Sequence, residues 1–191
     1  MAGKVVIVSA PSGAGKTTIV RHLMSISELK LEFSVSACTR PMRNGEVDGK
    51  DYHFMTVDRF KSLIDDDAFV EWEEVYKNSY YGTLKSEVAR IHKKNYNVLF
   101  DVDVMGGVNL KEKYAGDALA VFIMPPSIDA LKERLIKRGT DSEEKIAGRI
   151  NKASLELKFA RKFDVVVVND DLDTALCETE KLVAEFLNVK L

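Results

Sequence analysis

The sequence contains few of the residues that mark exported, disulfide-bonded or membrane-spanning proteins. Its only cysteines, Cys38 and Cys177, are far apart and neither belongs to a C-x-x-C pair, so no disulfide framework or zinc site is indicated. The first apolar run, residues 5–8, is too short for a signal sequence or a membrane span, and no later run reaches about 18 apolar residues. We therefore expect a cytoplasmic protein that does not bind membranes.

An excess of charge of one sign is also absent. The 191 residues include 28 Lys and Arg and 30 Asp and Glu, which leaves a net charge of -2 and predicts no general attraction to nucleic acid or anionic lipid. With 46% hydrophobic and 30% charged residues, the composition is that of an ordinary globular domain. A chain of this length buries roughly 70% of its unfolded surface, so we expect one domain over residues 1–191.

No arrangement of histidine with serine or aspartate suggests nucleophilic or general-base catalysis. His22, His53 and His92 are scattered, and each is more simply interpreted as a helix or loop residue. Any chemistry must therefore depend on other side chains.

What the sequence does contain is a set of short β-branched or aliphatic runs separated by helical patterns. Continuous apolar runs of this kind are typical of strands that are buried on both faces of a parallel sheet. The runs cover residues 5–8, 98–100, 119–124 and 165–168. Apolar residues with helical spacing follow Lys16 and recur over residues 175–187, after a predicted cap at 169–171. Strands that alternate with helices predict an α/β fold.

Two stretches fit this pattern less well. Residues 33–82 mix short strand-like pieces with arginines, tyrosines and the acidic run "IDDDAFVEWEEV". Residues 127–162 are predicted to be helical and basic, with ten Lys or Arg against six acidic residues. A basic face of this kind suits a phosphate-rich ligand.

The segment "SAPSGAGKTT", residues 9–18, lies between the first predicted strand and a helix, which is the context of a phosphate-binding loop. Such a loop holds phosphates by backbone N–H groups, while Lys16 reaches the outer phosphates and Thr17 ligates magnesium. Ala10 stands where the G-x-x-x-x-G-K-[ST] pattern asks for glycine, which matters only if this residue needs a positive φ. A glycine-rich turn with an incidental lysine is the alternative, and it explains less of the segment.

A second phosphate site is suggested further along the chain. Arg40 and Arg43 lie three residues apart around a proline, with Ser36 and Tyr52 as neutral donors. Two guanidinium groups with hydroxyls form a clamp for a dianionic phosphate. Two solvated loop arginines are the alternative interpretation.

Glu71 and Asp101 are candidates for reading a base. Guanine presents N1–H and N2–H₂ donors that match a carboxylate, whereas adenine has no such pair. Asp101 closes the apolar run "NVLFDVD" beside the loop, so it also resembles an acid that supports magnesium, and its role is open between metal, base or both. Glu71 taken alone also fits a surface acid.

Several separate motifs occur in an order that resembles the guanylate kinase family. They are "SAPSGAGK", "FSVSACTRPMRNGEVDGKDYHF", "FVEW", "YYGT", "DVDVMGG", "RLIKRGTDSEEKIAGR" and "VVVNDDLD". The resemblance covers about residues 5–185 and implies an enzyme that transfers the γ-phosphoryl group of ATP to GMP, and to dGMP, with Mg²⁺ as cofactor. It also implies a three-layer P-loop NTPase fold with a parallel central sheet, a small nucleoside-monophosphate-binding subdomain and a helical lid. The expected core is residues 1–32, 96–126 and 163–191, the GMP-binding region about residues 33–95, and the lid about residues 127–162.

The resemblance assigns roles to residues through the matching motifs. The ATP site would consist of Ser9, Ala10, Pro11, Ser12, Gly13, Ala14, Gly15, Lys16, Thr17, Thr18 and Asn169. The GMP site would consist of Ser36, Arg40, Arg43, Tyr52, Glu71, Tyr81, Gly82, Thr83 and Asp101. The catalytic groups would be Lys16, Arg40, Arg43, Arg134, Arg138 and Arg149, with Thr17 as the Mg²⁺ ligand and an indirect role for Asp101 at the metal.

The chemistry that this resemblance implies requires no general base, because the acceptor phosphate is itself largely dianionic at neutral pH. The phosphoryl transfer would be accelerated by in-line positioning of the two substrates and by charge neutralisation from Lys16 and the arginines. Closure of the lid would exclude water. Asn169 taken alone also fits a helix cap, and the lid arginines fit a solvated helix face. Tyr81 directly precedes Gly82, which favours it over Tyr80 as the phosphate ligand.

Two other functions stay open at this point. A non-catalytic guanylate-kinase-like interaction module would keep the fold, although such modules typically lose the ATP loop that is present here. A kinase for another nucleoside monophosphate is the second alternative, against which Glu71 and Asp101 argue. The sequence separates neither GMP from dGMP nor a monomer from an oligomer.

Overall fold

The computed structural model describes residues 3–139 and 142–191, with Tyr76 and Arg138 described by their backbone alone. A five-stranded sheet lies at its centre in the order β2-β7-β1-β8-β9, and every neighbouring pair of strands is parallel. The strands are β1 (Val5–Ser9), β2 (Leu31–Phe33), β7 (Asn97–Val102), β8 (Ala118–Met124) and β9 (Val165–Val168). Four of them contain the predicted apolar runs. β2 was not predicted, because three residues are too few to establish a pattern.

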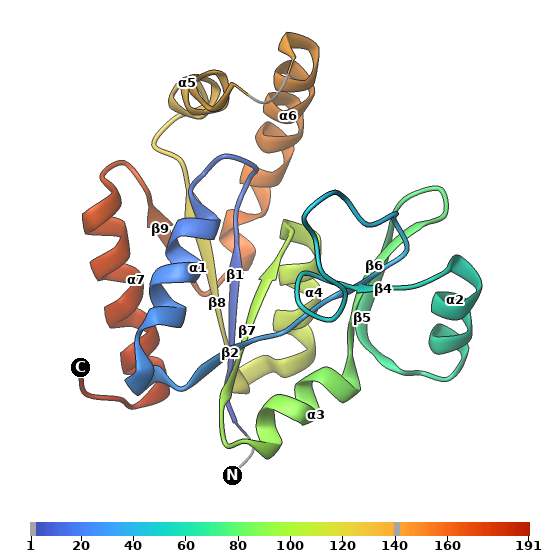
Figure 1. Cartoon of the computed structure of the whole chain (residues 1–191). Helices are drawn as coiled ribbons and strands as arrows, with labels where there is room; N and C mark the ends of the chain where they lie inside the picture. Colours follow the sequence, from blue (N-terminus) through green and yellow to red (C-terminus); the bar gives the residue numbers. More distant parts are fainter. Residues whose placement is uncertain (1–2, 140–141) are drawn as a thin grey trace.

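Helices cover both faces of this sheet and give three layers (Figure 1). Side chains alternate along β1, and both of its faces are apolar and buried. One face of the sheet packs against α1 (Lys16–Ser25) and α7 (Leu172–Leu187), and the other packs against α3 (Lys85–Lys93) and α4 (Val104–Tyr114). The predicted three-layer α/β fold with a parallel central sheet is therefore confirmed.

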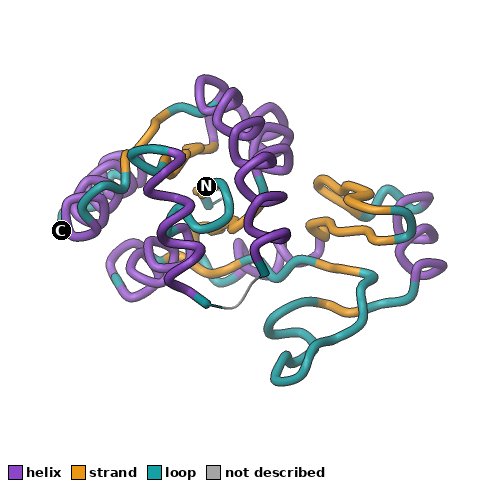
Figure 2. The backbone as a smooth tube through the Cα atoms, turned by 90° about the horizontal axis from the view of Figure 1, so that it is seen from above, coloured by secondary structure: helices purple, strands orange, loops and turns teal. Residues whose placement is uncertain are grey.

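A second sheet, of four strands, lies to one side of the core (Figures 1 and 2). Its order is β4-β3-β6-β5, and it is mixed, because β3 is parallel to β4 but antiparallel to β6. The elements are β3 (Ala37–Cys38), β4 (His53–Phe54), α2 (Val57–Asp65), β5 (Phe69–Tyr76) and β6 (Ser79–Leu84). Phe60 of α2 stacks on Phe69 and Tyr80, with ring centroids 4.3 and 5.4 Å apart. This small subdomain therefore has a hydrophobic core of its own.

Two further helices, α5 (Ile128–Arg138) and α6 (Glu143–Glu156), project beyond the same end of the sheet as the β1–α1 loop (Figure 1). Each begins after a serine whose hydroxyl caps the first turn. Their apolar sides pack against each other and form a separate buried cluster. Short 3₁₀ helices lie at η1 (Ser27–Leu29), η2 (Ala115–Asp117) and η3 (Leu157–Lys162).

The C-terminal helix α7 is capped by Asp171, whose carboxylate accepts the N–H of Thr174 at 2.9 Å. The interpretation of Asn169 as a helix cap is therefore wrong. Across residues 3–139 and 142–191, none of the helices combines the length and the apolar content that crossing a membrane requires.

The carboxyl ends of β1 and β7 are held together by a side chain. Ser9, the last residue of β1, donates from its hydroxyl to the backbone carbonyls of Val102 and Asp103, at 3.1 and 2.9 Å. Both strands lead directly into loops that precede helices, which is the edge at which open α/β sheets bind ligands. The candidate site is built at this edge.

Candidate active site

The loop between β1 and α1 has the backbone shape that phosphate binding requires. Gly13 and Gly15 adopt φ values of 95° and 98°, which an L side chain rarely tolerates. Ala10 is not among the positive-φ residues of the described chain, and it lies buried in the hydrophobic core. The alanine that replaces the first glycine of the motif therefore causes no strain.

Asn169 holds this loop in place from the end of β9. Its side-chain amide donates to the carbonyl of Ala14 at 2.8 Å, and its backbone N–H donates to Met124 at 2.8 Å. A Cβ on Gly15 would lie 2.2 Å from the same amide nitrogen, so only glycine fits beside it. Arg134 of α5 donates to the Asn169 carbonyl at 2.8 Å. Asn169 thus joins the loop, the sheet and α5, and its side chain is directed at the loop.

Lys16, the first residue of α1, forms an ion pair with Asp101 and donates to the carbonyl of Val102 at 2.8 Å. Asp101, which the sequence left open between metal and base, therefore faces the loop lysine. A phosphate that enters the loop competes with this carboxylate for the Lys16 ammonium group.

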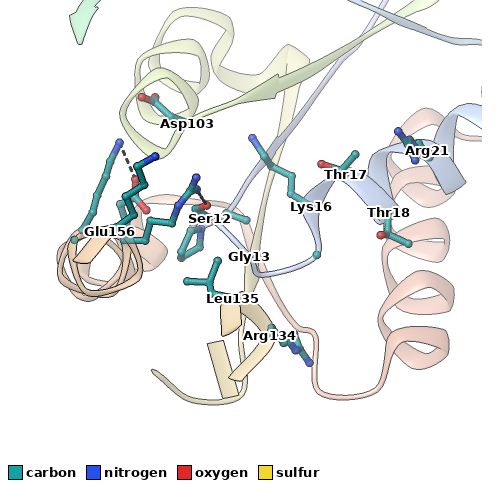
Figure 3. Close-up of a pocket in the computed structure, with 17 residues that line it drawn as sticks. Ser12, Gly13, Lys16, Thr17, Thr18, Arg21, Asp103, Arg134, Leu135 and Glu156 are labelled. Carbon is teal, nitrogen blue, oxygen red and sulfur yellow. Dashed lines mark hydrogen bonds and ion pairs between the residues drawn. The ribbon is translucent and has the colours of Figure 1, made fainter. Parts of the chain in front are cut away.

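A cavity of about 1100 Å³ opens above the loop. Its walls include Thr17 and Thr18 from the first turn of α1, and basic side chains from α5 and α6. Figure 3 shows Lys16 and Thr17 on one side of this cavity, with Asp103 and Glu156 on the other. The basic lining residues on α5 and α6 are Arg134, Lys145, Arg149 and Lys152. This combination suits a polyphosphate.

Two of the predicted lid arginines reach the loop region. Arg149 donates to the hydroxyl of Ser12 within the loop, and Arg134 reaches Asn169. Arg138 is in α5, but its side chain lies outside the described part of the chain. The structure thus brings two of the three arginines to the cavity.

The residues at the cavity fit a nucleotide-bound magnesium ion. Thr17 is exposed at the start of α1, next to Lys16. Mg²⁺ typically takes one or two oxygens from a protein and the remainder from phosphate and water. A single hydroxyl at this position suits an ion that is held mainly by the nucleotide.

Arg40 lies in the small subdomain and is already held in place. Its two terminal nitrogens donate to the two carboxylate oxygens of Glu46 at 2.7 and 2.6 Å. Its guanidinium carbon lies 4.8 Å from the ring centre of Tyr52 and 5.4 Å from that of Phe54. Glu46 also accepts the backbone N–H of Arg43 at 2.7 Å, while the Arg43 side chain is exposed.

Glu46 was not predicted as part of the site. Hydrogen bonds from Arg40 and from the Arg43 backbone lower the pKa of its carboxyl to about 2. It is therefore ionised at neutral pH and fixes one arginine while organising the backbone of the other. The sequence signal was an acid three residues after Arg43, within reach of a turn.

The two adjacent tyrosines of β6 have different surroundings. Tyr80 is buried in the subdomain core, against Phe60. Tyr81 lies against Tyr52, with ring centroids 6.1 Å apart, and pairs across the sheet with Cys38. We call Arg40, Glu46, Tyr52 and Phe54 the Arg40 cluster. The geometry favours Tyr81 as the tyrosine that faces this cluster, because it lies against Tyr52.

A carboxylate and a hydroxyl form a second polar pair on the subdomain. Thr83 is fully buried and donates to Glu71 at 2.9 Å across β5 and β6. Gly82 lies between Tyr81 and Thr83 in β6, and a Cβ on Gly82 would come within 2.8 Å of the Glu71 carbonyl oxygen. Burial raises the pKa of Glu71 to about 7, although the bond from Thr83 opposes this shift.

Asp103, rather than Asp101, is the core acid that lies toward Glu71. Its carboxylate caps α4 by accepting the N–H of Gly106 at 2.8 Å, and its charge contributes to the raised pKa of Glu71. A Cβ built on Gly106 would lie 3.2 Å from the Asp103 carboxylate and 3.7 Å from that of Glu71. The sequence analysis missed Asp103, whose only signal was the second acid of "DVDVMGG".

Ser36 lies at the entry to the small subdomain, one residue before β3. It is half-buried, and its backbone carbonyl accepts the N–H of His53 at 2.9 Å. It therefore lies on the segment that joins the core sheet to the small subdomain.

A phosphate-binding core, a subdomain with clustered arginine and tyrosine side chains, and basic helices over the loop define a P-loop kinase that acts on a small phosphorylated acceptor. The sequence profile of the guanylate kinase family matches residues 2–186, and the chain belongs to that family.

Individual relatives agree with this assignment. The guanylate kinase of Porphyromonas gingivalis is 50% identical over 184 residues, which cover 96% of this chain and 98% of the relative. That of Bacteroides thetaiotaomicron is 50% identical over 188 residues, which cover 98% and 92%. Among solved structures, guanylate kinase from Anaplasma phagocytophilum has a TM-score of 0.75 at 26% identity, with coverage of 96% of this chain and 86% of the other.

Proposed function

We infer that this chain is an ATP:GMP phosphotransferase, which converts ATP and GMP to ADP and GDP. The observation that carries the choice of acceptor is the pair of carboxylates formed by Glu71 and Asp103, of which Asp103 also lines the cavity that contains Lys16. Carboxylates accept the N1–H and N2–H₂ donors of guanine, whereas adenine offers no matching edge. We propose that Thr83 holds Glu71 in the orientation that this contact requires.

The phosphate of GMP would bind at the Arg40 cluster. Arg40 donates to Glu46 from both terminal nitrogens and to the Pro41 carbonyl from one of them, so a phosphate would bind through the donors that these three bonds leave over. We propose that Arg43, Tyr52, Tyr81 and Ser36 complete this site. The phosphate of GMP is largely dianionic at neutral pH, so it attacks without a general base.

Lys16 and the lid arginines would act on the transferring phosphoryl group. Lys16 moves from Asp101 to the phosphates, while Arg134 and Arg149 approach from the lid helices. We propose the same role for Arg138 from its position in α5. Family members need a divalent metal ion, which neutralises phosphate charge when bound, and we propose Mg²⁺ with Thr17 as its protein ligand.

Three parts of the chain would divide this work. We propose residues 1–32, 96–126 and 163–191 as the ATP-binding core, about residues 33–95 as the GMP-binding part, and about residues 127–162 as the lid. Use of dGMP and a cytoplasmic location stay predictions.

A coupled assay of ADP release tests the proposal, with GMP, dGMP, AMP, UMP and CMP offered in turn. GMP should stimulate ADP release far above the rate with ATP alone. Lys16→Ala should reduce the GMP-dependent rate by at least about 100-fold, since it removes charge stabilisation at the reacting group. Its matched control is Lys181→Ala, an exposed lysine of α7, which should behave as the wild type. Absence of stimulation by GMP would overturn the proposal. Stimulation by AMP, UMP or CMP instead would favour a kinase for that nucleotide, and no stimulation by any of them would leave the interaction-module alternative.

A further inference from the structure

The chain crosses between the core and the small subdomain at two places that lie side by side. The first crossing, residues 34–36, leads from β2 to β3, and the second leads from the end of β6 directly into α3. Glu87, in the first turn of α3, is only 6% exposed. Its carboxylate accepts the backbone N–H of Val35 at 3.1 Å and so joins the two crossings.

The Glu87 carboxylate is anchored from the core side as well. Arg90, one turn later in α3, donates to both of its oxygens at 2.7 and 2.9 Å. Arg90 also pairs with Glu32 of β2, which in turn binds Lys94 at 2.8 Å. From the subdomain side, the His53 ring nitrogen lies 3.8 Å from Glu87.

Glu87 is ionised in this environment. Burial by itself raises the pKa of its carboxyl, but the hydrogen bonds from Arg90 and from Val35 outweigh burial, and the pKa lies below its usual value. An ionised buried carboxylate is tolerated only with good partners, and removal of one partner leaves an uncompensated charge. The network is therefore sensitive to each of its members.

We propose that Glu87 is a positioning residue for the acceptor site, because it fixes the backbone of the first crossing, residues 34–36, which carries Ser36. Ser36 directly follows Val35, and its carbonyl accepts the N–H of His53, so the contact to Glu87 extends to both β3 and β4. The inference rests on the proposed function, in which Ser36 binds the GMP phosphate.

Paired substitutions separate this role from simple support of the fold. Glu87→Met keeps the length of the side chain but removes the acceptor for the Val35 N–H, whereas Glu87→Gln keeps an acceptor oxygen. We expect Glu87→Met to raise the KM for GMP roughly tenfold, since small displacements of positioning groups have effects of this size or larger, with the KM for ATP unchanged. Glu87→Gln should recover most of the loss.

Two further variants keep the test decisive. Arg90→Met retains the contact between Glu87 and Val35 but leaves the Glu87 carboxylate without its arginine partner. It should raise the KM for GMP by a smaller factor than Glu87→Met, with the KM for ATP unchanged, and it takes the place of Glu87→Met as the test if that variant does not fold; an unchanged KM for GMP would then overturn the inference. Lys85→Ala breaks the exposed ion pair with Asp67, 2.6 Å long, in the same turn of α3 and should leave both KM values unchanged.

Three outcomes would overturn the inference. Glu87→Met could change the KM values for GMP and ATP equally, or it could lower the melting temperature with both KM values unchanged. The third outcome is that Glu87→Gln shows no recovery of the KM for GMP. The proposed function is judged separately, by GMP-dependent ADP release in the wild type.

Discussion

The buried carboxyl of Glu71, a proposed binding group, lowers the stability of the free protein when it is ionised. Burial raises the pKa of its carboxyl from 4.5 to about 7, and the Thr83 hydroxyl only partly compensates. The folded chain therefore favours protonated Glu71, while the proposed contact with guanine requires the ionised form. Because the folded-state pKa is the higher one, the cost to stability appears as the pH rises from about 4.5 and is complete above about 7.

The affinity for guanosine should consequently depend on pH. We expect roughly tenfold tighter binding at about pH 8 than at about pH 6, because the ionised fraction of a group with a pKa of about 7 rises by that factor. Guanosine is the suitable probe, since it lacks the phosphate whose own titration near pH 6 would contribute. Isothermal titration calorimetry at both pH values measures the effect.

Glu71→Gln is the control for this prediction. It should bind guanosine more weakly and with little pH dependence. It should also melt at a higher temperature than the wild type at about pH 8, with a smaller difference at about pH 5, where Glu71 is protonated in the folded protein. A pH slope like that of the wild type in Glu71→Gln would exclude Glu71 as the titrating group.

The sequence predicted which residue types form the site better than it predicted which of them meet. Asp101 was predicted to serve the metal, the base or both, and in the free chain it pairs with Lys16, while Asp103 lies toward Glu71. The alternation of side chains between the two faces of β7 does not extend to Asp103. The chain turns into α4 at this residue, and the Asp103 carboxylate caps that helix. Glu46 was missed for a related reason: its partner Arg40 is six residues away in a loop without a regular repeat.

At the level of whole elements, the β1–α1 loop depends on two glycines for different reasons. Both have positive φ, but only Gly15 also faces the Asn169 amide at a distance that excludes a Cβ. That amide cannot move aside without losing its bond to Ala14, so the loop and β9 are mutually constrained.

Gly15→Ala should therefore abolish binding of a non-hydrolysable ATP analogue, measured by calorimetry. Gly45→Ala is the matched control, because Gly45 has φ 87° with open space around it and lies in the small subdomain. Both variants incur about 1 kcal/mol or more for an alanine at positive φ, so both melting temperatures fall, and that of Gly15→Ala falls further because its Cβ meets the Asn169 amide. Only Gly15→Ala should lose the ATP analogue. Retention of analogue binding by Gly15→Ala would show that the contact with Asn169 does not constrain the loop.

Local patterns predicted the elements of the core more completely than those of the small subdomain. The apolar runs of β1, β7 and β8 are buried on both faces of the central sheet, and that of β9, an edge strand, is partly buried, so these sequences are continuous apolar runs. The strands β3 and β4 have two residues each and are defined by pairing with distant segments, such as Ala37 with His53 and with Gly82. Pairing between segments so far apart leaves no trace in a local pattern.

Across the whole molecule, hydrophobic cores of different size support the proposed functional parts. The central sheet is covered on both faces, whereas the small subdomain depends on a cluster of Ala37, Phe60, Phe69 and Tyr80. Opening free energies vary with the local buried apolar surface, and elements that move during function come from the less stable end. The subdomain should therefore open more readily than the core.

Amide hydrogen exchange tests this expectation for the intact protein. Amides of β5 and β6 should exchange faster than those of β1, β7 and β8 in the free chain, because less apolar surface protects them. GMP should slow exchange in β5 and β6, since it would bridge Glu71 and Thr83 to the Arg40 cluster, whereas an ATP analogue alone should protect mainly the β1–α1 loop and β9. The same analogue serves as the internal control for binding without an acceptor. Uniform exchange across the two sheets, or equal protection of β5 and β6 by both ligands, would mean that the subdomain is not an independent unit for acceptor binding.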